Sequence, residues 1–395
     1  MIALIIIMAI FLFILLFVVD FKMGRKHHQK IARKLSFEQT TGDYSLFKNG
    51  SPMYEKLFQD IHQASVQVDI FFYLIDNDYI SQNFLQVLKN KASEGVPVRL
   101  LADRLGGYRI NKQIRQELAD AGVEFHFAEK PGFPYFFYRL HRRNHRKIAV
   151  IDGKIAFVGG FNIGKNYIGE TSKFGDWRDY HLRLTGPVVK ELQEVLFDDW
   201  YLSTGETLTP LDNQGSGNEK VRVVATDGVG LEDEIDEMIQ RAEQELLIGT
   251  PYFIPTNRLL SSLEKALERG VDLHIMIPMK SDHPFVKEAG IPYLDYLYRR
   301  GAKIGFFDAG FYHAKVIIID GQLADLGTAN FDRRSLFLNK EVNTFIYEQV
   351  FIGDLRKMYF EDFKDAVPFD DDWLKNRSIG TRINEKIAII LRPFL

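Results

Sequence analysis

Two stretches of this 395-residue chain carry the same polar residues at the same spacing. The first, HRKIAVIDGKIAFVGGFN, begins at His145, and the second, HAKVIIIDGQLADLGTAN, begins at His313. In each stretch a lysine follows the histidine two residues later, an aspartate comes after four more residues, and an asparagine ends the pattern. Internal repetition of this kind predicts a fold made of two copies of one unit.

Helix and strand patterns recur in the same order on both sides of a polar segment. Apolar strands are predicted at 68–74 and 246–253, and in each half a helix ending in glycine then leads to another strand. Strands that alternate with helices indicate an α/β sheet in each half. Residues 203–219, rich in Gly, Thr, Asn and Ser, are typical of a linker. We therefore expect one half at 46–202 and the other at 220–395, related by a pseudo-twofold axis.

The first 19 residues carry no charge and are almost entirely aliphatic or Phe, which is long enough to cross a hydrocarbon core. A cleaved signal peptide would need a basic stretch before this run and small residues after it, and a buried core helix would show a polar face. We expect a retained transmembrane anchor at 1–22 and a basic juxtamembrane segment at 23–45. The basic residues after the span are Lys22, Arg25, Lys26, Lys30, Arg33 and Lys34.

This basic cluster predicts a single-pass protein of the cell membrane with its catalytic domain in the cytoplasm, because positive charge favours that side. The same residues would attract anionic membrane lipids, although a solvated basic helix is also compatible with them. The net charge of −3 provides no overall basic field for nucleic acid. The absence of cysteine excludes disulfides, thiolate nucleophiles and cysteine zinc sites, and fits a reducing compartment.

The polar residues of the repeats suit phosphate chemistry. Residues two apart on a strand point to one face, so each histidine should face the same side as its lysine. Two lysines and two asparagines around one point would hold phosphate oxygens and stabilise a five-coordinate transition state. A single His-x-Lys would carry little weight, but no packing requirement places the same polar set beside two very apolar strands.

The tandem His-x-Lys-x4-Asp motifs with trailing Gly-x-x-Asn resemble the signature of the phospholipase D superfamily. Finer features resemble the bacterial cardiolipin synthases: Thr250-Pro251-Tyr252-Phe253, Asp176-Trp177-Arg178-Asp179, and Asn330-Phe331-Asp332-Arg333-Arg334-Ser335 leading to Asn339-Lys340-Glu341. The resemblance implies an α/β fold of two tandem phospholipase D-like α-β-α sandwich halves, preceded by one N-terminal transmembrane helix.

The resemblance also implies roles for these residues. One histidine attacks phosphorus and the other protonates the leaving alcohol; the family favours His145 as nucleophile and His313 as general acid, although the residues alone do not choose. A carboxylate should orient the attacking imidazole. Glu341, which follows His313, fits such a position, and Asp179 is its counterpart for His145, with Asp176 as a second possibility. The phosphoryl oxygens would be held by Lys147, Lys315, Asn162 and Asn330.

The remaining motif residues have less direct roles. Asp152 and Asp320 belong to the catalytic signature, but we expect them to be scaffold residues, ion-paired away from the phosphate. Gly160 and Thr328 stand where the family often has serine, so the hydroxyl contact with substrate is expected only from Thr328. The chemistry needs no metal and no other cofactor, since neither motif offers a carboxylate cluster at cation-ligand spacing. Surface or structural roles are expected for His27, His28, His62, His126, His274 and His283.

Two further segments leave alternatives open. The stretch PGFPYFFYRLHRRN at 131–144 suits a membrane interface, where aromatic bodies sink and arginines meet phosphate, but a core strand would also fit. The tail at 387–395, with Arg382, Lys386 and Arg392 among isoleucines and leucines, indicates either an interfacial helix or a packed terminal element.

The hypothesis from sequence is a cardiolipin synthase, in which phosphatidylglycerol is both donor and acceptor and glycerol is released through a phosphatidyl-histidine. A phospholipase D-type hydrolase shares every residue named above and differs only in its acceptor. A nuclease or other phosphodiesterase of the superfamily fits less well because of the anchor and the net charge. An inactive lipid-binding scaffold would have no need of the two histidines.

Overall fold

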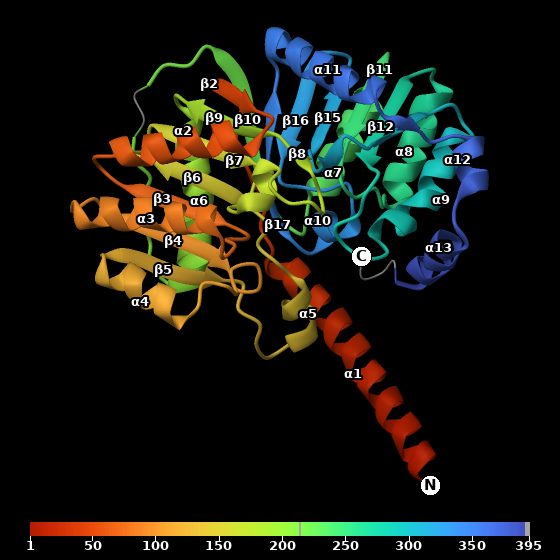
Figure 1. Ribbon diagram of the computed structural model, residues 1–395, viewed down its shortest axis with the longest axis horizontal. Helices are drawn as coiled ribbons and strands as arrows, with labels where there is room; N and C mark the ends of the chain where they lie inside the picture. The colour runs from red at the N-terminus through yellow and green to blue at the C-terminus, as the bar shows by residue number, and fades with distance from the viewer. Residues whose placement is uncertain (213–214, 392–395) are drawn as a thin grey trace.

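One continuous sheet runs through both halves of the computed structural model, which describes residues 1–212 and 215–391 (Figure 1). The strands of the first half are β2 (Thr40–Phe47), β3 (Val68–Phe72), β4 (Val98–Asp103), β5 (Val123–Ala128), β6 (Lys147–Ile151), β7 (Ile155–Gly159) and β9 (His181–Thr185). Those of the second half are β10 (Glu219–Asp227), β11 (Glu245–Gly249), β12 (Asp272–Pro278), β13 (Lys303–Phe307), β15 (Val316–Ile319), β16 (Leu323–Gly327), β17 (Lys340–Ile346) and β18 (Val367–Pro368). Short β1 (Leu35–Ser36) pairs with β10, and β8 (Asp176–Arg178) pairs with β14 (Gly310–Tyr312) outside the main sheet.

The strand order is symmetric about the centre of the sheet. Antiparallel β2 and β10 join the halves, with Gly42 opposite Glu219 and Thr40 opposite Val221. Outward from this pair the order is β9-β7-β6-β3-β4-β5 on one side and β17-β16-β15-β11-β12-β13 on the other. Because strands at equal distance from the centre carry equivalent sequence patterns, the predicted pseudo-twofold arrangement of two α/β halves is confirmed. The sheet of the first half already begins at Thr40, ahead of Leu46.

Helices cover both faces of the sheet. The helices are α1 (Ile2–Ile31), α2 (Gly50–Gln63), α3 (Tyr79–Ser93), α4 (Lys112–Asp120), α5 (Phe136–His141), α6 (Val188–Thr204), α7 (Leu231–Arg241), α8 (Asn257–Glu268), α9 (Val286–Tyr298), α10 (Arg333–Phe337), α11 (Gln349–Lys364), α12 (Asp371–Asn376) and α13 (Ile379–Leu391), with a 3-10 turn at Lys165–Ile168. Buried side chains of α6 and α11, including Trp200 and Tyr359, share one apolar core with strands of both halves. Two outer cores lie under α2 and α3 in the first half and under α7, α8 and α9 in the second.

Between α6 and β10, residues 205–212 and 215–218 form neither helix nor strand. The continuous apolar runs of the motif strands are fully buried: every residue of β6 and β15 is shielded from solvent. Burial on both faces is what a central strand between two helical layers requires.

Helix α1 projects from the body (Figure 1). Among the described residues it is the one helix long and apolar enough to cross a membrane, at Leu4–Ile31, with a mean hydropathy of 3.2 in its most apolar stretch. It continues without a break to Ile31 and includes Lys22, Arg25, Lys26 and Lys30 of the basic cluster. The protein is therefore associated with the membrane through its N-terminal helix.

The aromatic segment at 131–144 packs against this anchor. Its residues form the short helix α5, and the Phe137 ring lies 5.6 Å from the Phe13 ring and 5.1 Å from the Phe17 ring. The Asp20 carboxylate accepts a hydrogen bond from the Tyr138 backbone N–H at 3.0 Å, which caps the first turn of α5. The alternative of a core strand is therefore wrong. Arg392 of the predicted tail lies outside the described residues.

Candidate active site

Each motif forms a β-hairpin whose turn is specified locally. Asp152 and Gly153 both have positive φ, as do Asp320 and Gly321 in the second half. The Lys154 N–H closes the first turn on the Ile151 carbonyl at 3.0 Å. An Asp-Gly pair in the left-handed region is the favoured two-residue turn between antiparallel strands. The Asp-Gly dipeptide thus sets the register of β6 with β7 and of β15 with β16.

The motif aspartates lie at the far ends of these strands from the histidines. Asp152 accepts hydrogen bonds from the backbone N–H groups of residues 65–67 at 2.7–3.1 Å. Asp320 accepts them from the N–H groups of residues 243–245 at 2.8–2.9 Å. The expected ion pair is therefore replaced by three backbone donors. Each carboxylate fixes the turn that enters the neighbouring strand, β3 or β11, and thus supports the fold.

The two histidines are positioned by backbone contacts across the interface of the halves. The His145 N–H donates to the Lys340 carbonyl at 2.9 Å, and the Lys340 N–H donates to the Arg143 carbonyl at 2.9 Å. In the symmetric place, β14 runs parallel to β8 and the His313 N–H donates to the Arg178 carbonyl at 2.7 Å. Each histidine therefore lies beside the residue that precedes a carboxylate of the other half.

The side chains follow this backbone pairing. His145 Nδ1 donates to Glu341 Oε2 at 3.0 Å, and His313 Nδ1 donates to Asp179 Oδ2 at 2.6 Å. The pairing expected from the sequence is therefore wrong, since the two carboxylates are exchanged between the histidines. Asp176, the second candidate, is exposed at the start of β8. The exchange arises because the residues before the carboxylates, Lys340 and Arg178, pair through their backbones with the histidine segment of the opposite half.

Both histidines are neutral at neutral pH. Burial lowers the pKa of His313 to about 4, and Lys315 acts in the same direction. Burial also lowers the pKa of His145, against the opposing effect of Glu341. Burial alone would raise the pKa of Glu341, but His145 and Lys147 hold it below its usual range. A neutral imidazole that donates from Nδ1 to a carboxylate leaves the lone pair of Nε2 free to attack.

The motif lysines are buried beneath the histidines. Lys147 Nζ donates to the His145 carbonyl at 2.7 Å, and Lys315 Nζ donates to the His313 carbonyl and lies 3.5 Å from Asp179 Oδ2. Burial lowers the pKa of Lys147 to about 7, with Lys315 acting in the same direction and Glu341 opposing it. An anion between these lysines would be strongly stabilised, since it would restore their full charge.

The motif asparagines differ in how far they are already engaged. Asn162 Oδ1 accepts from the Leu74 N–H at 3.1 Å, and its amide donates to the Tyr167 hydroxyl at 3.1 Å. Asn330 Oδ1 is buried and makes no hydrogen bond within the described part of the chain. The Asn330 amide is therefore the freer of the two to meet a ligand.

Gly160 and Thr328, at the positions where the family often has serine, lie beside the two carboxylates that hold the histidines. Thr328 Oγ1 donates to Glu341 Oε2 at 2.6 Å and accepts from the Val342 N–H at 2.9 Å. Its hydroxyl is thus engaged behind Glu341, whereas the sequence predicted a substrate contact. A Cβ on Gly160 would lie 2.0 Å from Asp179 Oδ1, so glycine makes room for the other carboxylate.

The histidines face a cavity of about 500 Å³ between the halves. Several charged and aromatic side chains that line it were not predicted from the sequence. The Tyr73 ring lies edge-on to His145 at 5.0 Å, and the Trp177 ring lies 4.9 Å from His313. His283, expected to be a surface or structural residue, is exposed at the rim. The remaining polar and aromatic lining includes Arg143, Asn162, Tyr167, Phe174, Tyr252, Asp282, Asn330, Asp332, Arg334 and Asn339.

The two arginines in this lining differ in their partners. Arg143 is bonded to the buried carboxylate of Asp103 at 3.1 Å. Arg334 donates to the His141 carbonyl at 2.8 Å and pairs with no carboxylate among the described residues. The sequence alone does not distinguish Arg334 from its neighbour Arg333. That Arg334 lines the cavity is evident only from the fold.

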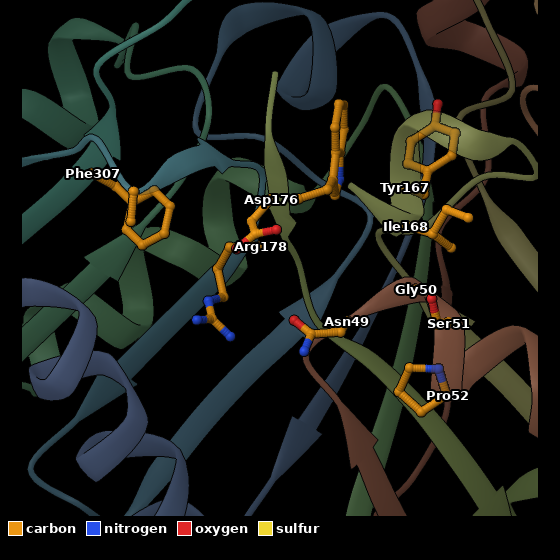
Figure 2. Close-up of a pocket in the computed structure, with 11 residues that line it drawn as sticks. Asn49, Gly50, Ser51, Pro52, Tyr167, Ile168, Asp176, Arg178 and Phe307 are labelled. Atoms are coloured by element: carbon orange, nitrogen blue, oxygen red, sulfur yellow. The ribbon is translucent and has the colours of Figure 1, made fainter. Parts of the chain in front are cut away.

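A second cavity of about 270 Å³ lies behind β8 (Figure 2). It is lined by Asp176, Arg178, Phe307 and the first residues of α2, and it shares Tyr167 and Trp177 with the histidine cavity. The guanidinium group of Arg178 in this cavity is neutralised by Asp362, since Arg178 Nε lies 3.1 Å from Asp362 Oδ2.

In the described parts of the chain, no group of three or more histidine or acidic side chains is arranged to hold a metal ion.

Known proteins resemble the chain in sequence and in fold. The family model described as "Cardiolipin synthase, PLD-like domain" matches residues 57–173 and 235–363. The minor cardiolipin synthase ClsB of Bacillus subtilis is 40% identical over 99% of both chains, and a cardiolipin synthase of Geobacillus sp. is 37% identical over 88% of this chain and 71% of its own. The phosphatidylserine synthase structure from Haemophilus influenzae has a TM-score of 0.68 at 14% identity, covering 94% of this chain and 100% of its own. The resemblance seen in the tandem motifs is thereby confirmed: the chain belongs to the phospholipase D superfamily, in the family of cardiolipin synthases with PLD-like domains.

Proposed function

We propose that this protein is a cardiolipin synthase, which transfers the phosphatidyl group of one phosphatidylglycerol to a headgroup hydroxyl of another and releases glycerol. The observation that carries the proposal is the pair of neutral histidines, each held by a carboxylate of the other half, facing one cavity. Two imidazoles on opposite sides of a phosphodiester can divide the work of nucleophile and acid.

In the first step, His145 Nε2 attacks phosphorus and the bond between phosphorus and the glycerol oxygen breaks. His313 gives its proton to that oxygen, and glycerol leaves. In the second step, a hydroxyl of the acceptor lipid attacks the phosphatidyl-histidine, its proton passes to His313, and the phosphorus–nitrogen bond breaks. The two steps restore both imidazoles and consume no other reagent.

Charge explains how His313 can serve as an acid despite its low pKa. A phosphodiester anion next to the ring favours the protonated form, so substrate binding raises the pKa of His313. Lys147, Lys315 and the free amide of Asn330 surround the same phosphate and stabilise the charge that develops on its oxygens. These groups are in place before substrate binds and need little reorganisation.

The acceptor is a lipid because the site belongs to a membrane. A cavity of about 500 Å³ holds two headgroups while the acyl chains stay in the bilayer. Arg334 on its wall reaches the carbonyl of His141, whose ring lies 5.6 Å from Phe21 of the anchor helix. The lining thus continues directly to the element that enters the membrane, where lipid hydroxyls are concentrated.

The proposed topology is single-pass, with the catalytic body on the cytoplasmic side. Lys22, Lys26 and Lys30 follow the apolar span at intervals of four residues and are exposed along one side of α1, where anionic headgroups can reach them. Lys34 is bonded to Glu234 at 2.6 Å and joins the helix to the body. Such charge favours the cytoplasmic side.

The test is the membrane-reconstituted protein with radiolabelled phosphatidylglycerol, resolving cardiolipin plus glycerol from phosphatidic acid. Cardiolipin is the expected main product, and phosphatidic acid as the main product would identify a hydrolase instead. His145→Ala and His313→Ala should each abolish turnover, whereas His62→Ala, on the exposed side of α2, should retain it. Full activity of either cavity variant would refute the paired-histidine mechanism.

A further inference from the structure

The C-terminal helix α13 turns its apolar side outward. Ile379, Ile383 and Ile387 are 79%, 53% and 40% exposed, and their spacing of four residues puts them on one side of the helix. Ile389 is also exposed, at 49%. A surface helix of a soluble domain has the opposite arrangement, with its apolar side on the core.

The side of α13 that faces the protein is small and polar. Ala388 is fully buried and packs with Ile254, Val286 and Ala289 of the second half. Glu385 accepts from Arg377 at 2.7 Å. Since α13 is held to the body by these contacts, its exposed isoleucines are available for another partner.

The position of α13 identifies that partner. Figure 1 shows α13 and α5 on the side of the body from which α1 projects. Phe133, next to α5, is 85% exposed on this side. An apolar surface on the side of the body from which a membrane-spanning helix projects meets the bilayer that this helix crosses, whereas a second copy of the chain would have to displace lipid to reach it.

The charges beside the isoleucines fit the same partner. Arg382 and Lys386 are exposed next to Ile383 on the helix surface. Isoleucines flanked by basic residues are typical of helices that lie in the plane of a membrane, where the cations meet anionic headgroups.

We propose that α13 lies in the interfacial plane of the bilayer as a second membrane contact, and brings the mouth of the histidine cavity to the lipid surface. Val286, which packs on Ala388, also lines that cavity. The contact between α13 and α9 thus holds one wall of the cavity close to the membrane surface, from which lipid headgroups enter. The anchor keeps the protein on the membrane, and α13 fixes the orientation of its body.

The absence of cysteine makes a direct test possible, since one introduced cysteine is the sole labelling site. Ile383→Cys carries an environment-sensitive fluorophore in the full-length protein, reconstituted in vesicles of phosphatidylcholine and phosphatidylglycerol. Val350→Cys on α11 is the matched control, an aliphatic residue 74% exposed on the side of the body away from α1.

The Ile383→Cys label should emit at shorter wavelength than the Val350→Cys label, resist aqueous iodide, and be quenched by shallow lipid-borne quenchers. Equal iodide quenching at the two positions would overturn the proposal. Protection from iodide without quenching by the lipid probes would also overturn it, and would indicate a protein partner. The fluorescence readout does not require turnover, so it stands apart from the outcome of the cardiolipin assay.

A functional measurement complements the labels. Ile383→Asp should lower the ratio of activity on vesicles to activity in detergent micelles by about tenfold, the effect of withdrawing one buried isoleucine from lipid. Val350→Asp should leave this ratio at the wild-type value. An unchanged ratio for Ile383→Asp would mean that α13 does not orient the enzyme on the bilayer.

Discussion

Replacing Glu341 with glutamine tests the exchanged pairing of histidines and carboxylates. Glu341 is fully buried, and its oxygens accept from His145 Nδ1 at 3.0 Å, Thr328 Oγ1 at 2.6 Å and Ser335 Oγ at 2.8 Å. Because these neighbours all donate, a glutamine must turn its own donor toward one of them. It also removes the negative charge that stabilises the positively charged phosphatidyl-histidine.

The expected magnitude follows from this geometry. Removing one partner of a buried charged pair costs about 3–5 kcal/mol. If this loss falls on the step carried out by His145, kcat decreases about 10²- to 10⁴-fold. Asp176→Asn, which changes an exposed carboxylate on β8, is the matched control and should leave kcat unchanged.

An activated substrate reveals which histidine each carboxylate serves. Bis(p-nitrophenyl) phosphate releases p-nitrophenolate, which leaves without protonation, so its cleavage no longer needs the general acid. His313→Ala and Asp179→Asn should therefore recover much of their first-step rate on this ester, as measured by the burst of p-nitrophenolate. His145→Ala and Glu341→Gln should not recover.

The grouping of the variants decides the outcome, whichever histidine is the nucleophile. If Glu341→Gln behaves like His313→Ala, or Asp179→Asn like His145→Ala, then the cross-half pairing is incorrect. A loss smaller than about tenfold in Glu341→Gln would show that the carboxylate does not support the chemical step.

Three further predictions concern stability, pH and lipid binding. Asp152→Asn should lower the free energy of unfolding by about 1–3 kcal/mol and leave kcat unchanged, because the carboxylate accepts from three backbone N–H groups away from the cavity. Thermal unfolding in detergent measures this loss of stability. A decrease in kcat equal to that of Glu341→Gln would contradict the scaffold role. The pKa of His313 is about 4 in the fold and 6.5 when unfolded, so the unfolded chain binds more protons between these values and stability falls by about 3 kcal/mol as pH drops from 6.5 to 4. His313→Asn should lose this dependence, and an unaltered pH profile would refute the assignment. Arg334→Gln should raise KM for phosphatidylglycerol about tenfold, because it removes a positive charge from the cavity wall. Arg333→Gln should leave KM unchanged. If the two variants have the same KM, Arg334 does not bind the lipid.

Local sequence patterns were sufficient to predict the repeated architecture and the class of chemistry. Equal spacing of His145 and His313 from their lysines, aspartates and asparagines predicted two equivalent halves, and the fold confirms them. This information is local: apolar strand runs, a glycine at a helix end and an uncharged apolar segment each depend on residues that are neighbours in the chain. Local patterns could therefore place strands in each half and the anchor helix before any tertiary contact was known.

The contacts between groups of the active site follow from the tertiary fold. Glu341 joins His145 because the residues before each of them pair across the interface, and a backbone contact over nearly 200 positions leaves no trace in local pattern. The aromatic run near Phe137 had strand character, but packing against α1 made it a helix. Asp152 became a backbone acceptor because the turn before β3 brings three N–H groups to it. In each case the deciding energy comes from partners distant in the chain, so only the folded molecule could reveal it.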